Sequence, residues 1–299
     1  MNFLHFLAGL RTPAGDFFFQ AVTYLAQELF VVTVICWLYW CSNKKLAYTL
    51  GFSYFISGLL IQGLKITFRI PRPWILDPKF QPVASAILDA TGYSFPSGHT
   101  QSITALLGTL AVRLRKTAGK IVCLIVILAV MFSRMYLGCH TPKDVLVSFF
   151  LTILCVLLTN HFLYKKNSFE GKEGPVSVVL FLLCGALMIY ALFLNHQGII
   201  ETHYASDCLK AAGAGTAFSI GYYAENRYIR FTLPKTTKAK AARLIFGLLV
   251  AALLLEGLKL IIGTSLAAAF FRYFAAVLWI ILLYPLLFSR KGHAKTPAA

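Results

Sequence analysis

Pro175–Leu194 has the sequence PVSVVLFLLCGALMIYALFL, which contains 20 residues and no charged side chain. An α-helix of about 20 apolar residues is long enough to cross the hydrocarbon core of a bilayer. The rest of the 299-residue chain has the same character, because 58% of its residues are hydrophobic and only 13% are charged. Soluble domains average about 25% charged residues. This composition excludes an ordinary soluble protein and a disordered chain, and it predicts an integral membrane protein.

Eight further apolar runs bring the number of predicted transmembrane helices to nine. These runs are Phe17–Trp40, Leu46–Phe68, Ser97–Val112, Ile121–Tyr136, Val145–Leu163, Cys208–Tyr223, Leu244–Ile262 and Leu266–Phe288. The predicted fold class is therefore all-α, a polytopic membrane protein. Cys208–Tyr223 is rich in Ala and Gly, and an interfacial or re-entrant segment is the alternative there. We interpret its Gly213, Gly215 and Gly221 as positions of close packing between helices.

The basic residues indicate how the chain is oriented. The formal net charge is +17, and with nine crossings 18 of the 28 Lys and Arg residues fall on one side of the membrane. This larger group comprises Lys44, Lys45, Arg113, Arg115, Lys116, Lys120, Lys165, Lys166, Lys172, Arg227, Arg230, Lys235, Lys238, Lys240, Arg243, Arg290, Lys291 and Lys295. The smaller group on the opposite side comprises Arg11, Arg69, Arg72, Lys79, Arg134 and Lys143. The positive-inside rule makes the larger group cytoplasmic, so the N-terminus is expected outside or in a lumen and the C-terminus in the cytoplasm.

The same charges exclude one class of partner. They are spread over short loops and form no single folded basic face, so we expect no binding of nucleic acid.

Three polar segments interrupt the apolar background, and the predicted topology brings all three to the outer face. They are Lys65–Pro73 after the second span, Pro96–His99 before the third, and Ser133–Asp144 between the fourth and fifth. Each has a structural explanation on its own, because basic side chains at helix ends extend to the lipid interface and Ser or Thr-Pro pairs begin helices. Their convergence at one face favours a common site.

The residue types in these segments suit a phosphate group. Lys65 would supply a point charge, and Arg72 and Arg134 would supply planar forks that match phosphate oxygens. The backbone N–H groups of Gly98 and His99 would lie at a helix N-terminus, which favours an anion.

Two histidines add the chemistry of a phosphate transfer. His140 and Asp144 are four residues apart at the start of a helix, so the carboxylate can orient the ring and leave one nitrogen free to attack. His99, on a separate helix, is placed to protonate the leaving oxygen.

The full pattern is Lys, six residues, Arg-Pro; then Pro-Ser-Gly-His; then Ser-Arg, five residues, His, three residues, Asp. It resembles the three-part signature of the type 2 phosphatidic acid phosphatase superfamily. The members of this superfamily are membrane-bound, histidine-dependent lipid phosphatases. The resemblance covers Phe17 to about Leu194. It implies that residues 1–194 form a six-helix phosphatase core and that residues 195–299 form a three-helix membrane extension.

The resemblance also implies a role for each matched residue. His140 would be the nucleophile that forms a phosphohistidine, Asp144 would orient it, and His99 would be the general acid. The residues implied to bind phosphate are Lys65, Arg72, Ser97, Gly98 and Arg134. No metal and no cofactor is implied.

The implied reaction is hydrolysis of a lipid phosphate monoester or diphosphate. The expected partners are membrane lipids and a phosphorylated amphiphile such as phosphatidate, a sphingoid-base phosphate or a polyprenyl diphosphate. Three alternatives stay open: a sugar-phosphate phosphatase of the glucose-phosphate type, a lipid phosphotransferase, and a transporter or binding-only protein. The plasma membrane and the endoplasmic reticulum are equally compatible with the sequence.

Polar residues outside the signature allow three minor predictions. The loop 195–207 carries His196, Glu201, His203 and Asp207, which we interpret as a polar border or lid of the site, with a metal site as the alternative. Cys139 and Cys208 share a face and can pair in a disulfide or stay free. The charged residues Glu256, Lys259 and Arg272 are expected to form an ion pair, or else to contact a headgroup.

Overall fold

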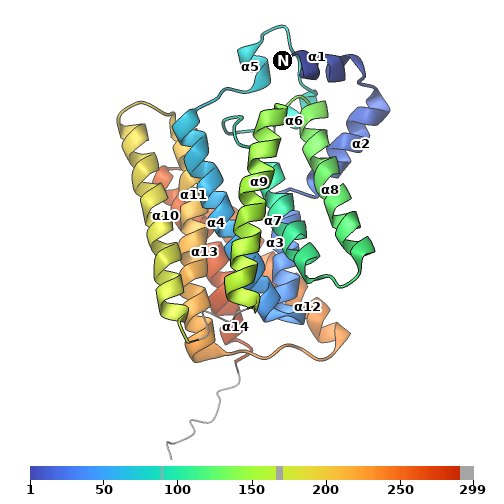
Figure 1. Ribbon diagram of the computed structural model, residues 1–299. Helices are drawn as coiled ribbons and strands as arrows, with labels where there is room; N and C mark the ends of the chain where they lie inside the picture. The colour runs from blue at the N-terminus through green and yellow to red at the C-terminus, as the bar shows by residue number, and fades with distance from the viewer. Residues whose placement is uncertain (89, 166–170, 290–299) are drawn as a thin grey trace, which may run out of the picture.

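The computed structural model describes residues 1–88, 90–165 and 171–289, and these residues form helices and loops without any strand. The chain is an all-α polytopic membrane protein, as predicted (Figure 1). Its helices are α1 (Asn2–Gly9), α2 (Pro13–Tyr24), α3 (Glu28–Trp37), α4 (Lys44–Phe68), α5 (Pro73–Leu76), α6 (Ala84–Ile87), α7 (Gly98–Arg113), α8 (Thr117–Tyr136), α9 (Pro142–Thr159), α10 (Glu173–His196), α11 (Thr202–Ala224), α12 (Thr237–Ile262), α13 (Leu266–Leu278) and α14 (Tyr284–Leu286). Short π-helical segments continue α3, α9, α11 and α13 at Leu38–Ser42, Asn160–Lys165, Glu225–Ile229 and Trp279–Leu283.

Helices occupy all nine predicted positions, but nine crossings are not confirmed. Within the described residues, 7 helical stretches are long and apolar enough to span a membrane. These stretches are Pro13–Ser42, Lys44–Leu76, Thr117–Tyr136, Pro142–Leu163, Glu173–His196, Thr237–Ile262 and Leu266–Leu286. The helix α7 has only 16 residues. The helix α11 has 23 residues, but its glycines and polar side chains make it less apolar than the seven stretches above.

The first predicted span is broken into two helices. Ala26 and Gln27 close short turns back to Thr23 and Tyr24, and α3 then begins at Glu28. An acidic side chain in the first turn favours a new helix start because it complements the helix dipole. The two halves have different neighbours, since α2 packs on α8 whereas α3 packs on α4, α7 and α12. The break places Gln27 and the exposed Glu28 on the wall of a cavity between the helices.

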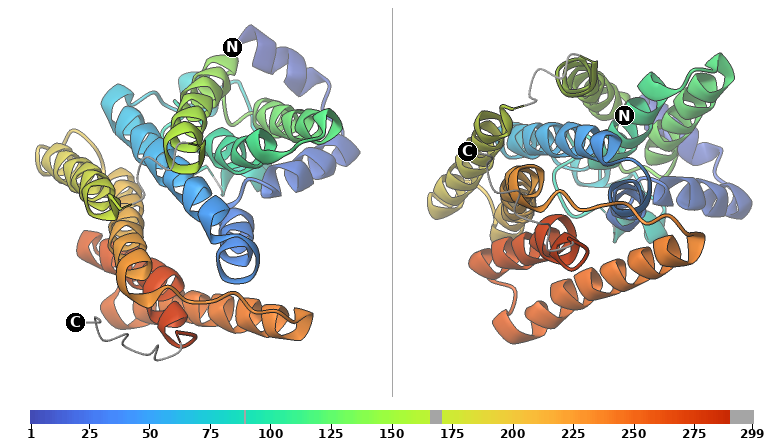
Figure 2. Two further views of the ribbon diagram at one scale, coloured as in Figure 1. Left: turned by 60° about the horizontal axis from the view of Figure 1, so that its bottom comes forward. Right: turned by 90° about the horizontal axis from the view of Figure 1, so that it is seen from below.

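The centre of the bundle is α4, which contacts α7, α9, α10 and α11. Seen from below in Figure 2, α12 lies along one edge of the molecule. Most of its side chains are exposed, as expected for a helix that faces lipid. At the end of the bundle where α14 lies, the buried Glu225 accepts hydrogen bonds from Lys44, Tyr48 and the backbone N–H of Phe231.

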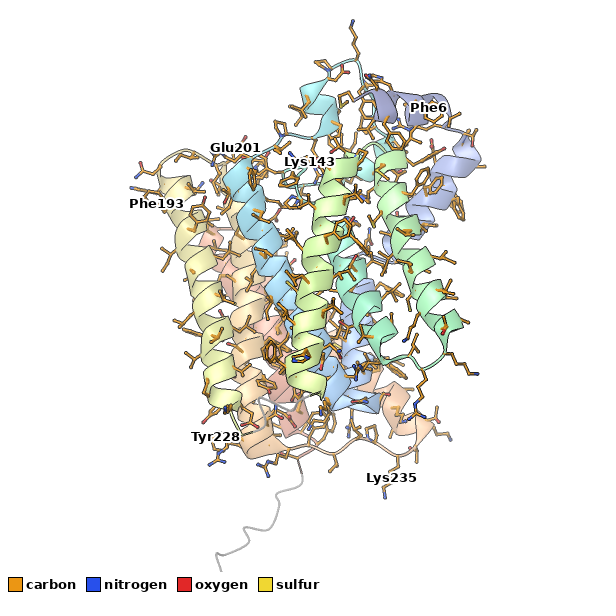
Figure 3. The ribbon with its side chains drawn as sticks, in the orientation of Figure 1. Phe6, Lys143, Phe193, Glu201, Tyr228 and Lys235 are labelled. Carbon is orange, nitrogen blue, oxygen red and sulfur yellow. The ribbon has the colours of Figure 1, made fainter. Side chains whose placement is uncertain are left out.

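Helix direction brings the three polar segments to one end of the bundle. The N-terminus, Lys143 and Glu201 lie at this end, whereas Tyr228 and Lys235 lie at the other (Figure 3). At this end α4 and α8 finish while α7 and α9 begin. Four of the basic residues on which the orientation was predicted lie outside the described residues: Lys166, Arg290, Lys291 and Lys295.

The three glycines of α11 are packing positions, as the sequence indicated. A Cβ at Gly213 would overlap the backbone carbonyl of Phe270 on α13, and a Cβ at Gly221 would overlap Ile281. A Cβ at Gly215 would lie 2.6 Å from the Sγ atom of Cys184. Contacts this close let α11 approach α10 and α13 along its whole length.

Replacing Gly213 by alanine is expected to lower the stability of the protein in detergent by about 1–3 kcal/mol, because the Phe270 backbone cannot move aside as a side chain would. Thermal unfolding of the full chain measures this effect. Gly185→Ala on α10 is the matched control, since no atom lies within 4 Å of its added Cβ. Equal melting temperatures for the two variants would contradict close packing at Gly213.

Candidate active site

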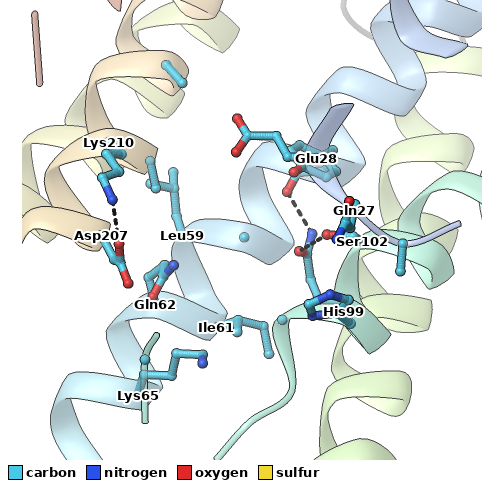
Figure 4. Close-up of a pocket in the computed structure, with 18 of the residues that line it drawn as sticks. Gln27, Glu28, Leu59, Ile61, Gln62, Lys65, His99, Ser102, Asp207 and Lys210 are labelled. Atoms are coloured by element: carbon cyan, nitrogen blue, oxygen red, sulfur yellow. Dashed lines mark hydrogen bonds and ion pairs between the residues drawn. The ribbon is translucent and has the colours of Figure 1, made fainter. Parts of the chain in front are cut away.

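A cavity of about 530 Å³ lies between the helices at the end where the polar segments meet. Its walls come from α3, α4, α7, α11 and α13. Figure 4 shows Asp207 of α11 across the cavity from Glu28 of α3. Five of the predicted site residues line it: Lys65, Arg72, Gly98, His99 and His140.

Lys65 and Arg72 are fixed by one loop. Lys65 donates from Nζ to the Tyr93 carbonyl at 2.7 Å, and Arg72 donates from Nε to the Gly92 carbonyl at 2.7 Å. The chain reaches this arrangement because α4 ends at Arg69, whose φ of 50° reverses the backbone. Both basic side chains are therefore buried and held by backbone carbonyls, and no carboxylate of the described residues lies within 4 Å of either one.

His140 is a neutral imidazole with a defined tautomer. Its Nε2 lies 2.9 Å from Nη1 of Arg72, and a guanidinium can only donate, so Nε2 is the unprotonated nitrogen. Burial, followed by the charge of Arg72, lowers the pKa of His140 below its usual range. The proton then sits on Nδ1, which lies 3.6 Å from Oδ2 of Asp144. Nε2, whose lone pair accepts from Arg72, belongs to a side chain that lines the cavity.

Asp144 is held in place before any ligand binds. Its Oδ2 accepts hydrogen bonds from Ser94 Oγ at 2.6 Å and from the backbone N–H of Thr141 at 2.8 Å. The second bond is part of the capping box that begins α9. Ser94 lies outside the three-part pattern, and nothing in the sequence marks it as a support of Asp144.

The start of α7 forms the floor of the site. Ser97 is the N-cap, and its Oγ accepts from the backbone N–H of Thr100 at 3.4 Å. A Cβ built on Gly98 would meet nothing within 4 Å, so the backbone is open to the cavity there. His99 lines the cavity, and its buried Nε2 has no hydrogen-bond partner among the described residues.

Arg134 is fully buried near the end of α8. Its Nη1 donates to Thr23 Oγ1 at 3.1 Å, while Nε and Nη2 have no partner among the described residues. A buried guanidinium with unused donors is costly unless an anion completes its hydrogen bonds. Thr23, on α2, is a contact that the sequence did not indicate.

The comparisons with known proteins agree with this geometry. Residues 45–168 match the sequence model of the PAP2 superfamily, and residues 209–296 match the model described as PAP2 superfamily phosphatase, transmembrane extension. The chain belongs to the PAP2 superfamily. The resemblance stated from the three motifs is thereby confirmed.

Relatives of this PAP2 chain are known from other organisms. Sphingosine-1-phosphate phosphatase 2 of Homo sapiens is 26% identical over 216 residues, which cover 69% of this chain and 51% of that protein. The probable sphingosine-1-phosphate phosphatase of Dictyostelium discoideum is 29% identical over 239 residues, which cover 72% of this chain and 56% of that protein. The chain thus spans about half the length of the curated relatives it matches. No solved structure matches it.

The PAP2 site includes residues of α11 that no motif contains. Tyr204 stacks on Tyr93 with ring centroids 3.8 Å apart, and the carbonyl of Tyr93 accepts the hydrogen bond from Lys65. Asp207 accepts a hydrogen bond from Thr91 at 3.3 Å and forms an ion pair with Lys210 at 2.8 Å. The sequence placed Asp207 in a bordering loop, whereas the structure places it on a helix that lines the cavity.

Four other residues that the sequence analysis considered as metal ligands or disulfide partners do not line the cavity: Glu201, His203, Cys139 and Cys208. His203 and Glu201 pair with each other at 3.4 Å on the surface. Among the described residues, no group of three or more His, Cys, Asp or Glu side chains is arranged to hold a metal ion. Cys139 and Cys208 are both buried and free rather than disulfide-bonded.

The charged residues of α12 and α13 behave differently from one another. Glu256 and Lys259 form an exposed ion pair at 3.8 Å, as expected. Arg272 instead donates to the Leu255 carbonyl at 3.0 Å.

Proposed function

We propose that this chain is an integral-membrane phosphatase that hydrolyses the phosphate monoester of a lipid, with a sphingoid-base phosphate as the substrate class, through a phosphohistidine intermediate. One observation carries the proposal: His140, whose Nε2 is unprotonated, lines a cavity together with Lys65 and Arg72, and the adjacent buried Arg134 has two donors without a partner among the described residues. The substrate class is supported by the names of the two relatives.

The first step transfers the phosphoryl group to the enzyme. Phosphate oxygens bind the three basic side chains and the backbone N–H groups at the start of α7, so Arg72 exchanges its bond to Nε2 for a bond to phosphate. The Nε2 lone pair of His140 then forms the N–P bond as the bond between phosphorus and the lipid oxygen breaks. His99, in its protonated form, gives its proton to that oxygen, and a lipid alcohol leaves.

Asp144 acts during this attack without exchanging a proton. Positive charge develops on the imidazole of His140 as Nε2 bonds to phosphorus. The carboxylate, which Ser94 and the backbone of Thr141 hold in place, stabilises that charge through the Nδ1 proton.

The second step returns the enzyme to its starting state. His99 is now neutral and accepts a proton from a water molecule, whose oxygen attacks phosphorus. The N–P bond breaks, inorganic phosphate leaves, and Nε2 of His140 regains its lone pair. All the groups that this cycle needs are side chains and backbone N–H groups of the chain itself.

The test is release of inorganic phosphate by the detergent-purified full chain with excess chelator. The substrates are a sphingoid-base phosphate, phosphatidate, a polyprenyl diphosphate and glucose 6-phosphate. Turnover of the sphingoid-base phosphate above the others is the expected result. Preference for the sugar phosphate or the diphosphate would overturn the substrate class, and product that appears only with an added alcohol acceptor would indicate a phosphotransferase. Binding without turnover of any substrate would overturn the enzyme proposal.

We also propose that the site faces the lumen or the exterior, with the N-terminus on that side and the C-terminus in the cytoplasm. The positive-inside rule supports this orientation. Residues 1–194 would form the phosphatase core and residues 195–299 the extension. A cysteine introduced at the exposed Lys79 should react with an impermeant thiol reagent added to intact cells or sealed lumenal-side-out vesicles, whereas one at the exposed Lys235 should not.

Replacing Arg134 by methionine is expected to lower kcat/KM for the lipid phosphate by about two to three orders of magnitude, because two donors to the transferring phosphate are lost. Arg134→Lys keeps the charge but loses the planar fork, so its loss should be intermediate. Arg11→Met is the matched control at the same end of the bundle, since the Arg11 guanidinium donates hydrogen bonds to backbone carbonyls and does not line the cavity. Equal activity of Arg134→Met and wild type would exclude a phosphate contact.

A further inference from the structure

A carboxylate lies beside the phosphate-binding cations. The added Cβ position of Gly92 lies 3.3 Å from Nζ of Lys65 and 3.8 Å from Oδ2 of Asp207, so both atoms converge on the same loop. Asp207 belongs to α11 and reaches the cavity from the wall opposite α3. Figure 4 shows Asp207 and Lys65 on the same side of the cavity and Glu28 on the other.

This carboxylate is held by neighbours that leave Oδ2 facing the site. Lys210 binds Oδ1 at 2.8 Å, and the Thr91 hydroxyl donates to Oδ2 at 3.3 Å. A carboxylate accepts more hydrogen bonds than these two, so Oδ2 retains capacity for a further donor.

An anionic side chain next to a phosphate site lowers the affinity for a ligand that carries only negative charge. It raises the affinity for a ligand whose phosphate has a cation close to it, since the cation then lies between the phosphate and the carboxylate. A sphingoid-base phosphate has this form, because its ammonium is on the carbon next to the one that bears the phosphate. Phosphatidate and lysophosphatidate have an oxygen there and no positive charge.

We propose that Asp207 recognises an ammonium group adjacent to the substrate phosphate and so selects amino-lipid phosphates over glycerolipid phosphates. The inference rests on the proposed phosphatase function and assigns a specificity-determining residue to it. It also gives α11 a direct part in substrate choice. Most of this helix lies in the region that matches the transmembrane extension of the family, residues 209–296. The cationic groups of Lys65 and Lys210 and the phenol of Tyr204 are the other polar groups around this position.

The test compares kcat/KM for a sphingoid-base phosphate with kcat/KM for lysophosphatidate, which has one chain and the same phosphate but no amine. The wild-type protein is expected to have the higher kcat/KM for the sphingoid-base phosphate. Asp207→Asn should lower kcat/KM for the sphingoid-base phosphate about 10- to 100-fold, as expected for loss of a charge-assisted hydrogen bond. The value for lysophosphatidate should stay the same or rise. Glu28→Gln is the matched control, since it removes a carboxylate from the far wall of the same cavity. It should leave the ratio of the two kcat/KM values unchanged.

A second measurement does not depend on any variant. Wild type should hydrolyse the N-acetylated sphingoid-base phosphate, whose nitrogen is uncharged, at least about 10-fold less efficiently than the free amine. Equal efficiencies for the two substrates would overturn the inference. An equal fall in kcat/KM for both substrates in Asp207→Asn would also overturn it, because that result would mean that Asp207 only positions Lys65. Either result leaves the phosphatase function standing, whereas that function fails only if wild type hydrolyses no lipid phosphate.

Discussion

Replacing His140 by alanine is expected to reduce kcat for lipid phosphate hydrolysis by at least about four orders of magnitude, since removal of the proposed covalent nucleophile would disable both steps. The structure leaves little room for a substitute. Nε2 of His140 accepts a hydrogen bond from Arg72, and His99, the only other histidine among the described residues that line the cavity, lies at the start of a different helix. Substrate binding should survive the change, because the three basic side chains remain.

Two measurements check this result. Phosphate release at saturating substrate gives kcat, and brief incubation with radiolabelled substrate followed by alkaline quenching traps the phosphoenzyme, which should be present in wild type and absent in His140→Ala. His203→Ala is the matched control, because that histidine lies at the same end of the molecule but on the surface. Activity of His140→Ala within about tenfold of wild type would show that another group attacks phosphorus.

Much of this site could be predicted from the sequence because its chemistry sits at helix ends. The order and lengths of the apolar runs predicted that Lys65, His99 and His140 reach the same face, and the structure places all three at one cavity. Local signals were sufficient there. Ser97 as an N-cap and Asp144 in the first turn of α9 follow from short-range hydrogen bonds that the residue types dictate.

The contacts that could not be predicted are those between helices distant in sequence. Neither proline nor glycine lies in the segment 25–27, so nothing marked the break that brings Glu28 into the cavity. Thr23 and Ser94 are ordinary polar residues whose roles arise only when Arg134 and Asp144 are packed against them. The same holds for Asp207, which reaches the site because the glycines of α11 allow close packing that no single-sequence pattern specifies.

Replacing His99 by alanine is expected to lower kcat for a lipid phosphate by about 10²- to 10⁴-fold, the usual contribution of general acid–base catalysis. The buried Nε2 of His99 has no hydrogen-bond partner within the part of the chain that the structure describes, and His99 lines the same cavity as His140, so the reacting group is the partner we propose for it. A lipid alkoxide is a poor leaving group and needs a proton, which we propose that His99 supplies.

The leaving group separates proton transfer from phosphate binding. Nitrophenolate departs without a proton, so His99→Ala should form the phosphoenzyme from p-nitrophenyl phosphate at nearly the wild-type rate. The second step still needs His99 to accept a proton from water, and its loss should slow release of phosphate from His140. Stopped-flow absorbance should therefore show a burst of nitrophenolate equal to the enzyme concentration, followed by slow turnover, with phosphohistidine accumulating during the burst. If the variant instead lost activity equally on both substrates and showed no burst, His99 would contribute to binding of the phosphate group rather than to movement of a proton.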